Sequence, residues 1–508
     1  MKTKVSAFIF PILLAAALSV HAQDDFGFGF GFDEEEPEAA SGGGGIGSLT
    51  GGMSINGKAQ AEFFFYAKEF ESGDAFRNIR LGDVFSGELN FSAEGSLADG
   101  VIKLKLRPDF QDPSRILSLD EAYVRAFLGK RLTVEGGLRK LTWGKADSMG
   151  PLDVINPLDY SDLSNMTDLQ AIKIARPLLR LSYGIGAFTR IEGVFVPWLQ
   201  GDRFSQTPGG RWTPAQVADL QNAVYAKFAP QLALLPGYGI TNVSFPSIDP
   251  SAVSIDTSTL EYAQGGLRFT TTAGSSDIGV QYYSGFFPRP AAVLNERAVT
   301  ALTGTIMGIV TGSGTAAEKE DAINAALAGL DPKTLFNIAY TRYHQIGVDY
   351  ARVIAGFNLR GEFAANVTED LKGTDGHVYN PSLAWSLGFD RDIFAGINVN
   401  LQVNETIRLL NSKTGSDPLA DIEAGADLTA TRLTLVLSKK FLRDELELRA
   451  TGIWGIEDMD CYILPALIWA KGDITLELSG GIFAGDLKGN LGQYRDNGFF
   501  RTVLTYSF

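Results

Sequence analysis

The chain has 508 residues, of which 45% are hydrophobic and 20% are charged, and this balance excludes a protein that is disordered throughout. Asp and Glu number 59 against 44 Lys and Arg, and the net charge of −15 argues against nucleic acid as a partner, because phosphate recognition needs basic side chains. With one cysteine and three histidines the chain cannot form an intramolecular disulfide or a Cys/His metal site, and we expect neither a metal nor a cofactor.

The first 22 residues have the pattern of a secretory signal peptide. Lys2 and Lys4 give a basic start, an apolar run covers residues 8–20, and small residues precede Gln23. Because Gln23 rather than a cysteine follows the predicted cleavage position, we expect no lipid anchor there. Farther along, no stretch approaches the ~18 consecutive apolar residues that a membrane-spanning helix requires, which excludes a helical membrane protein.

The segment 23–52 is acidic and rich in glycine, and we predict that it is a disordered periplasmic segment. Phenylalanine alternates with glycine over residues 26–32, acidic residues follow, and glycines occupy residues 42–45. This pattern offers no face that could pack in a core. We interpret the segment as a spacer, and the alternative is a docking peptide for a periplasmic partner.

From Met53 onward, apolar and polar residues alternate with the period of two that is typical of β-strands. Over residues 397–404, for example, Ile397, Val399 and Leu401 alternate with asparagine and glutamine. We recognise about 18 such segments, within a range of about 16 to 18, and short connections alternate with mostly long ones. This layout predicts an all-β protein: a transmembrane antiparallel β-barrel over residues 53–508 in the bacterial outer membrane, with short turns and both chain ends on the periplasmic side.

Two of the long connections carry helical patterns. Thr213 precedes Pro214 and apolar residues at helical spacing up to Phe228. Residues 315–318 form a capping box before a second apolar series that ends near Gly329. We therefore expect long outer loops that are partly helical.

The terminal strand, residues 499–508, carries Phe500, Leu504, Tyr506 and Phe508 on one face. This ending resembles the C-terminal signal by which outer-membrane barrels are delivered to the barrel-assembly machinery. We predict that Tyr506 and Phe508 form the assembly signal. Outer-membrane lipid and this machinery are therefore expected partners.

Aromatic residues near the predicted strand ends suit the girdles that mark the two membrane interfaces. Trp143, Tyr283 and Tyr343 are among them. This interpretation places their side chains on the outer surface of the barrel, and a stack that binds a ligand is the alternative.

Two neighbouring segments resemble a known family. Residues 137–144 read Gly-Leu-Arg-Lys-Leu-Thr-Trp-Gly, and residues 153–160 read Asp-Val-Ile-Asn-Pro-Leu-Asp-Tyr. Together they resemble a stretch shared by a family of bacterial outer-membrane barrels classified as a domain of unknown function. The resemblance implies a porin-like, channel-forming barrel and supplies no substrate, and the inserts 199–257 and 288–339 have no counterpart in it.

Charged residues on the polar face of the first strands are the predicted lumen and selectivity residues. A tight turn at Asp99 would place Glu94 near Lys103 and Asn90 near Arg107, in a cross-strand ladder that narrows and polarises a pore. The alternative is that the charges only neutralise one another inside a wet barrel. The full set is Glu88, Glu94, Lys103, Lys105, Arg107, Glu121, Arg125, Glu135 and Arg139.

The loop 144–168 is predicted to fold into or across the mouth of the barrel. It holds five aspartates, and the Asn156-Pro157 pair favours a turn. A calcium site is the alternative, but the spacing does not match an EF-hand loop. We predict a loop constriction formed by Asp153, Asn156, Pro157 and Asp159.

These features favour an outer-membrane channel for uptake or export of small solutes through a polar lumen, as a monomer or an oligomer. The alternatives are a non-conducting surface barrel that binds ligands or acts as an adhesin, and a transporter of hydrophobic molecules. An enzyme is not expected, because no histidine or cysteine has a recognisable nucleophile and base context.

Overall fold

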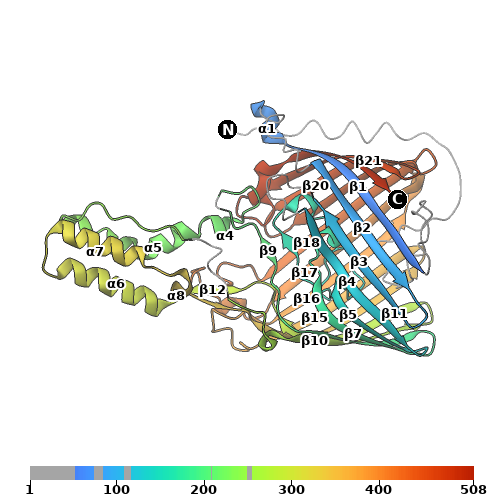
Figure 1. Cartoon of the computed structure of the whole chain (residues 1–508), viewed down its shortest axis with the longest axis horizontal. Helices are drawn as coiled ribbons and strands as arrows, with labels where there is room; N and C mark the ends of the chain where they lie inside the picture. Colours follow the sequence, from blue (N-terminus) through green and yellow to red (C-terminus); the bar gives the residue numbers. More distant parts are fainter. Residues whose placement is uncertain (1–51, 74–83, 108–115, 208, 249–254) are drawn as a thin grey trace.

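The computed structural model describes residues 52–73, 84–107, 116–207, 209–248 and 255–508, so the predictions for residues 1–51 lie outside the described residues. Eighteen strands form one antiparallel sheet in which β1 pairs with both β2 and β22 (Figure 1). The sheet is therefore a closed barrel, and closure leaves no strand with an unpaired edge. The predicted fold class and strand number are confirmed.

The strands occupy the positions that the alternation indicates. They are β1 Met53–Tyr66, β2 Phe85–Glu94, β3 Ala98–Leu106, β4 Leu117–Leu128, β5 Leu132–Arg139, β7 Arg176–Ile185, β8 Thr189–Val196, β10 Gln264–Ala273, β11 Ser276–Phe286, β14 Arg342–Ile354, β15 Phe357–Thr368, β16 Ser382–Asp392, β17 Ile397–Arg408, β18 Thr429–Phe441, β19 Leu446–Gly455, β20 Asp460–Lys471, β21 Ile474–Gly485 and β22 Phe499–Ser507.

Short turns join alternate strand pairs at one end of the barrel, and most connections at the other end are long. The connection between β19 and β20, residues 456–459, is the short exception at the long-loop end. Gly57 near the start of β1 exchanges backbone hydrogen bonds of 2.9 and 3.0 Å with Phe508. Both ends of the barrel sequence therefore lie at the short-turn end.

The outer surface of the barrel is apolar and its interior is polar, which inverts the usual arrangement of a soluble protein. On β14, Ile346 is 59% exposed, whereas the adjacent Gln345 is only 1% exposed. On β16, Leu387 is 59% exposed and Ser386 is 5% exposed. The alternation in the sequence thus separates an apolar outer face from a polar lumen.

The predicted register of the first hairpin is wrong. β2 and β3 pair Glu94 with Asp99, Asn90 with Lys103 and Glu88 with Lys105, because the turn lies at residues 95–97 rather than at Asp99. Each partner differs from the predicted one by an even number of residues, so the same side chains still face the lumen.

Short helices and two small strand pairs lie in the connections. The helical patterns correspond to α4 and α5 in one loop and to α7 in another, whereas α6 was not predicted. Among the described residues, no helix combines the length and the hydropathy needed to cross a membrane. The elements are α1 Ala67–Ser72, α3 Leu169–Ile172, α4 Ala215–Ala218, α5 Leu220–Leu232, α6 Glu296–Thr311, α7 Ala316–Ala328, α8 Pro332–Leu335, β6 Asp159–Tyr160, β9 Arg203–Phe204, β12 Ala291–Leu294 and β13 Phe336–Ala339.

Helices α5, α6 and α7 form a projection that extends away from the long-loop end of the barrel (Figure 1). Its core includes the fully buried residues Phe228, Ile306 and Leu327. At its base, the backbone N–H of Leu294 donates to the carbonyl oxygen of Leu419 at 2.8 Å, which ties the projection to the loop 409–428. The projection is thus a packed unit built from two loops.

The chain end offers a test of the predicted assembly signal. Phe508 closes the ladder with β1, and its ring stacks on Tyr506, which is 50% exposed on the outer face. Deleting Phe508 should therefore lower the yield of folded barrel in the outer membrane, measured as the heat-modifiable fraction on a gel. Thr505→Ser, a lumen-side change on the same strand, is the control. An undiminished yield from the deletion would show that the ending is an ordinary strand end.

Candidate functional site

The connection between β5 and β7, residues 140–175, folds into the barrel and crosses its lumen. One carboxylate of the opposite wall, Glu362 on β15, binds it through three backbone N–H groups. Ala146 donates to Oε1 at 2.7 Å, Lys145 donates to the same oxygen, and Leu152 donates to Oε2 at 3.2 Å. Glu362 is 5% exposed, so this clamp lies in the interior of the barrel.

Two loop glycines permit the close approach to Glu362. Gly144 has φ +102, and a Cβ there would lie 2.2 Å from Oε1 of Glu362; a Cβ on Gly150 would lie 2.5 Å from Oε2. A glycine of the wall permits a close approach too. Gly347 on β14 faces Leu152 of the loop, and a Cβ on Gly347 would lie only 2.2 Å from Leu152 Cδ2. Glycine on each side thus lets the backbone of one partner approach a side chain of the other closely.

The aromatic girdle prediction is wrong for three residues. Trp143, Tyr283 and Tyr343 are at most 4% exposed and belong to one buried cluster. The Trp143 ring packs against Gly266 of β10, where a Cβ would lie 2.9 Å from the indole. These side chains face inward because they fill the space between the wall and the inward loop, and tertiary packing decides this.

A second wall strand, β17, also holds the loop. The backbone N–H groups of Asp147 and Ser148 donate to Gln402 Oε1 at 2.9 and 3.0 Å. The carboxylate of Asp147 accepts from Asn400 at 2.9 Å and pairs with Arg360. The first half of the loop is therefore fixed to β15 and β17.

The four residues of the predicted loop constriction lie at or near the base of the loop. Asn156 joins the two loop ends, because its Oδ1 accepts from Leu141 N–H at 2.7 Å and its Nδ2 donates to the carbonyl oxygens of Arg139 and Ile174 at 3.0 and 2.9 Å. The carbonyl oxygen of Pro157 accepts from Ile174 N–H at 2.8 Å.

The two aspartates of this set form ion pairs. Asp153 pairs with Lys173 at 2.7 Å, and Asp159 pairs with Arg203 at 2.8 Å. Burial raises the pKa of Asp153, and the ammonium group of Lys173 acts in the opposite direction. Asp153, Asn156 and Pro157 also border the cavity described below, whereas Asp159 does not.

The middle of the loop reaches the wall formed by β20–β22. The hydroxyl of Tyr462 on β20 donates to the carbonyl oxygen of Ser164 at 3.3 Å, and Arg501 on β22 donates to Asn165. Leu163 and Met166 pack in a cluster with wall residues that include Leu464. The loop thus spans the lumen from β15 to β22.

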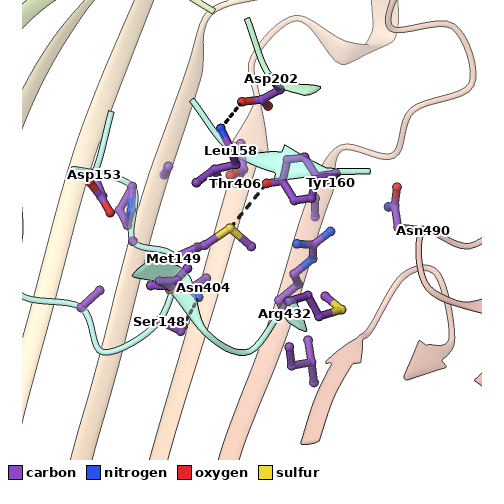
Figure 2. A pocket seen from close by; sticks show the side chains of 18 of the residues that line it. Ser148, Met149, Asp153, Leu158, Tyr160, Asp202, Asn404, Thr406, Arg432 and Asn490 are labelled. Atoms are coloured by element: carbon purple, nitrogen blue, oxygen red, sulfur yellow. Dashed lines mark hydrogen bonds between the residues drawn. The ribbon is translucent and has the colours of Figure 1, made fainter. Parts of the chain in front are cut away.

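A cavity of about 1290 Å³ lies between this loop and the wall formed mainly by β16–β22. Its lining runs from Lys488 near the long-loop mouth to Ile468 and Glu477 in the half of the barrel near the short turns. Met149 and Tyr160 of the loop and Thr406 and Arg432 of the wall line it, and Asn404 of the wall donates to the hydroxyl of Ser148 at 3.4 Å (Figure 2). This space is the candidate functional site.

The nine predicted selectivity residues do not border this cavity. Most form ion pairs near the first strands, while Glu94 and Arg107 are exposed at strand ends. A bulge in β4 adds Asp120, which was not predicted, as a partner of Lys105. The pairs are Lys58–Glu88 at 3.2 Å, Lys103–Glu121 at 2.9 Å, Lys105–Asp120 at 2.9 Å, Arg125–Asp99 at 2.8 Å and Arg139–Glu135.

The sequence reasoning missed the wall residues that line the cavity. Arg432 and Thr434 of β18 alternate with leucines, so the same parity argument could have placed them in the lumen. No comparable signal marks Glu362, because its role depends on a loop 216 residues away in the chain. Within the described ranges, no group of three His, Cys, Asp or Glu side chains could hold a metal ion.

No family model matches the sequence, and no curated protein matches it. The resemblance carried by Trp143-Gly144 and by residues 153–160 therefore stays a prediction.

Similar solved structures are outer-membrane barrels. OccAB4 of Acinetobacter baumannii is 8% identical with a TM-score of 0.45, over 90% of this chain and 98% of that chain. The outer membrane channel DcaP of the same organism is 10% identical with a TM-score of 0.40, over 91% and 99%. Wzi of Escherichia coli, a carbohydrate-binding β-barrel involved in capsule assembly, is 9% identical with a TM-score of 0.43, over 89% and 84%.

Proposed function

We propose that this protein is a porin-like channel of the bacterial outer membrane, through which small solutes cross in uptake or export. The observation that carries the proposal is the cavity of about 1290 Å³, because it lies inside a closed barrel and extends from the long-loop mouth toward the short-turn end. The inward loop narrows this space but leaves a passage beside β17–β19. A polar lumen of this kind suits hydrated solutes.

The outer surface supports a membrane location. Large apolar side chains of neighbouring strands face outward, among them Ile346 and Val348 on β14 and Leu387 on β16, which are 59%, 45% and 59% exposed. A soluble monomer rarely exposes such a continuous apolar surface, whereas lipid covers it at no cost. The predicted signal peptide directs the chain across the inner membrane, which is consistent with the outer membrane as its destination.

Conductance in a planar bilayer tests the proposal. The purified protein should give discrete current steps in potassium chloride. Thr434→Trp should reduce the step size several-fold, because the indole would fill part of the cavity that Thr434 lines. Leu435→Trp is the matched control, since the neighbouring residue has the opposite parity and faces lipid. If the unaltered protein gave no current, the channel proposal would be contradicted. If Thr434→Trp and Leu435→Trp reduced the step size equally, solutes would not pass through the cavity beside Thr434.

A surface ligand-binding barrel is the second candidate. The helical projection favours it, because a packed unit at the long-loop end offers a binding surface that conduction does not need. The inward loop, held at both walls, would then serve to fill the barrel. If the protein is such a barrel, it should carry no current in a planar bilayer. Its ligand binding should be lost when the helical projection is removed.

A further inference from the structure

Arg432 has a distinctive place in the cavity wall. In the strand register its neighbours are Asn404 on β17 and Gly455 on β19, and neither supplies a carboxylate. Among the described residues, no hydrogen bond or ion pair reaches its guanidinium group. Figure 2 shows this group directed toward the loop, below the ring of Tyr160. Arg432 is therefore a cation that borders the cavity, and no carboxylate in the described part of the chain pairs with it.

The other arginines of this wall are matched by carboxylates. Arg449 on β19 pairs with Glu447 at 2.7 Å, and Arg501 on β22 pairs with Glu477 at 3.0 Å. Arg449 and Arg501 lie in one row of the register, through Ala466 and Ser479. The guanidinium groups of Arg449 and Arg501 are therefore each compensated by a carboxylate, whereas none of the described carboxylates forms an ion pair with Arg432. Glu405 on β17 also lines the cavity, but in the register it lies opposite Thr431 and not opposite Arg432.

The carboxylates at the long-loop mouth of the cavity do not pair with Arg432. Asp427, Glu457 and Asp458 line the cavity from the loop and the turn at the ends of β18 and β19. Glu457 accepts from Thr429 and Thr431, both at 2.7 Å, and Asp458 accepts from Asn490 at 2.6 Å. Thr429 and Thr431 have the parity opposite to Arg432, so the residues that bind Glu457 at the rim of the cavity lie on the other side of β18 from Arg432.

Apolar side chains border the space around Arg432. Met149 and Tyr160 of the loop are in contact, with 3.5 Å between the Tyr160 hydroxyl and the Met149 sulfur, and Val436 and Ile453 line the facing wall. Methionine is unbranched and polarizable, so it adapts to apolar groups of different shapes. The passage therefore combines one unpaired guanidinium with an adaptable apolar surface.

We propose that the passage selects small organic anions, whose acidic group pairs with Arg432 while their apolar part lies beside Met149 and Tyr160. A guanidinium group suits carboxylates because it can donate two parallel hydrogen bonds. This inference rests on the proposed channel function and deepens it by naming a substrate class. Arg432 is then the residue that determines specificity.

The test compares benzoate with benzyl alcohol and benzylammonium, which share its ring but not its negative charge. In the unaltered protein, benzoate should reduce the potassium chloride current most strongly, and the reversal potential in a salt gradient should indicate anion preference. Arg432→Gln should weaken the benzoate effect about tenfold, which corresponds to about 1.4 kcal/mol. Lys471→Gln is the control for net charge, because Lys471 is 64% exposed at the short-turn end, outside the cavity.

A calorimetric titration of the detergent-solubilised protein with benzoate separates this inference from the channel proposal. Benzoate binding that Arg432→Gln abolishes, together with a silent bilayer, would support the anion site and contradict the channel. Conduction with the same benzoate response in Arg432→Gln would contradict the anion site and leave the channel standing. A preference for benzylammonium in the unaltered protein would also overturn the inference.

Discussion

Replacing Glu362 by alanine should raise the single-channel conductance several-fold and make the current noisier. The carboxylate accepts three backbone N–H groups of the inward loop, and its loss leaves Lys145, Ala146 and Leu152 without these partners. Each buried donor left unsatisfied costs about 1–3 kcal/mol, so the loop should detach from β15 and widen the passage. Single-channel recording measures the change directly.

Two further variants sharpen this test. Gly150→Ala should act in the same direction, because its Cβ would lie 2.5 Å from the Glu362 carboxylate. Glu192→Ala is the matched control: Glu192 is also a buried lumen carboxylate, but it pairs with Arg180 and Arg190 of the wall and not with the loop. If Glu362→Ala and Glu192→Ala change conductance equally, the loop does not control the passage.

Leu387→Arg should destabilise the folded barrel by about 2–4 kcal/mol, the range for an arginine on the lipid face at the membrane midplane. Leu387 lies in the middle of β16, is 59% exposed, and pairs across the ladder with Gly361 and Val403. The guanidinium group would have to enter hydrocarbon or distort the bilayer around it. Urea titration of the protein folded into lipid vesicles measures the free energy of unfolding.

Thr434→Arg is the control for this prediction. Thr434 lines the cavity, so an arginine there remains in the polar lumen and should change conductance while leaving the free energy of unfolding nearly unchanged. If Leu387→Arg is tolerated and Thr434→Arg prevents folding, the assignment of the two faces, and with it the membrane location, would be reversed.

The strand number and the two faces of the barrel follow from the sequence because they depend on a local period of two. Apolar and polar residues alternate along strands such as β14 and β16, and closure of an even number of strands places Met53 and Phe508 near the same end. The capping box Thr315–Glu318 is equally local, and it begins α7 as predicted. Helix α6 escaped prediction because Gly304 and Gly308 interrupt its apolar series.

Only the tertiary structure decided the register of the first hairpin and the position of the cavity. A shift by an even number of residues keeps every side chain on its face, so alternation cannot distinguish the pairing of Glu94 with Lys103 from its pairing with Asp99. The inward loop has no period at all, and its path depends on contacts with Glu362 and Gln402, which are distant in the chain. Because the space that the loop leaves unfilled is bordered by β17–β19, the cavity lies away from the charged first strands.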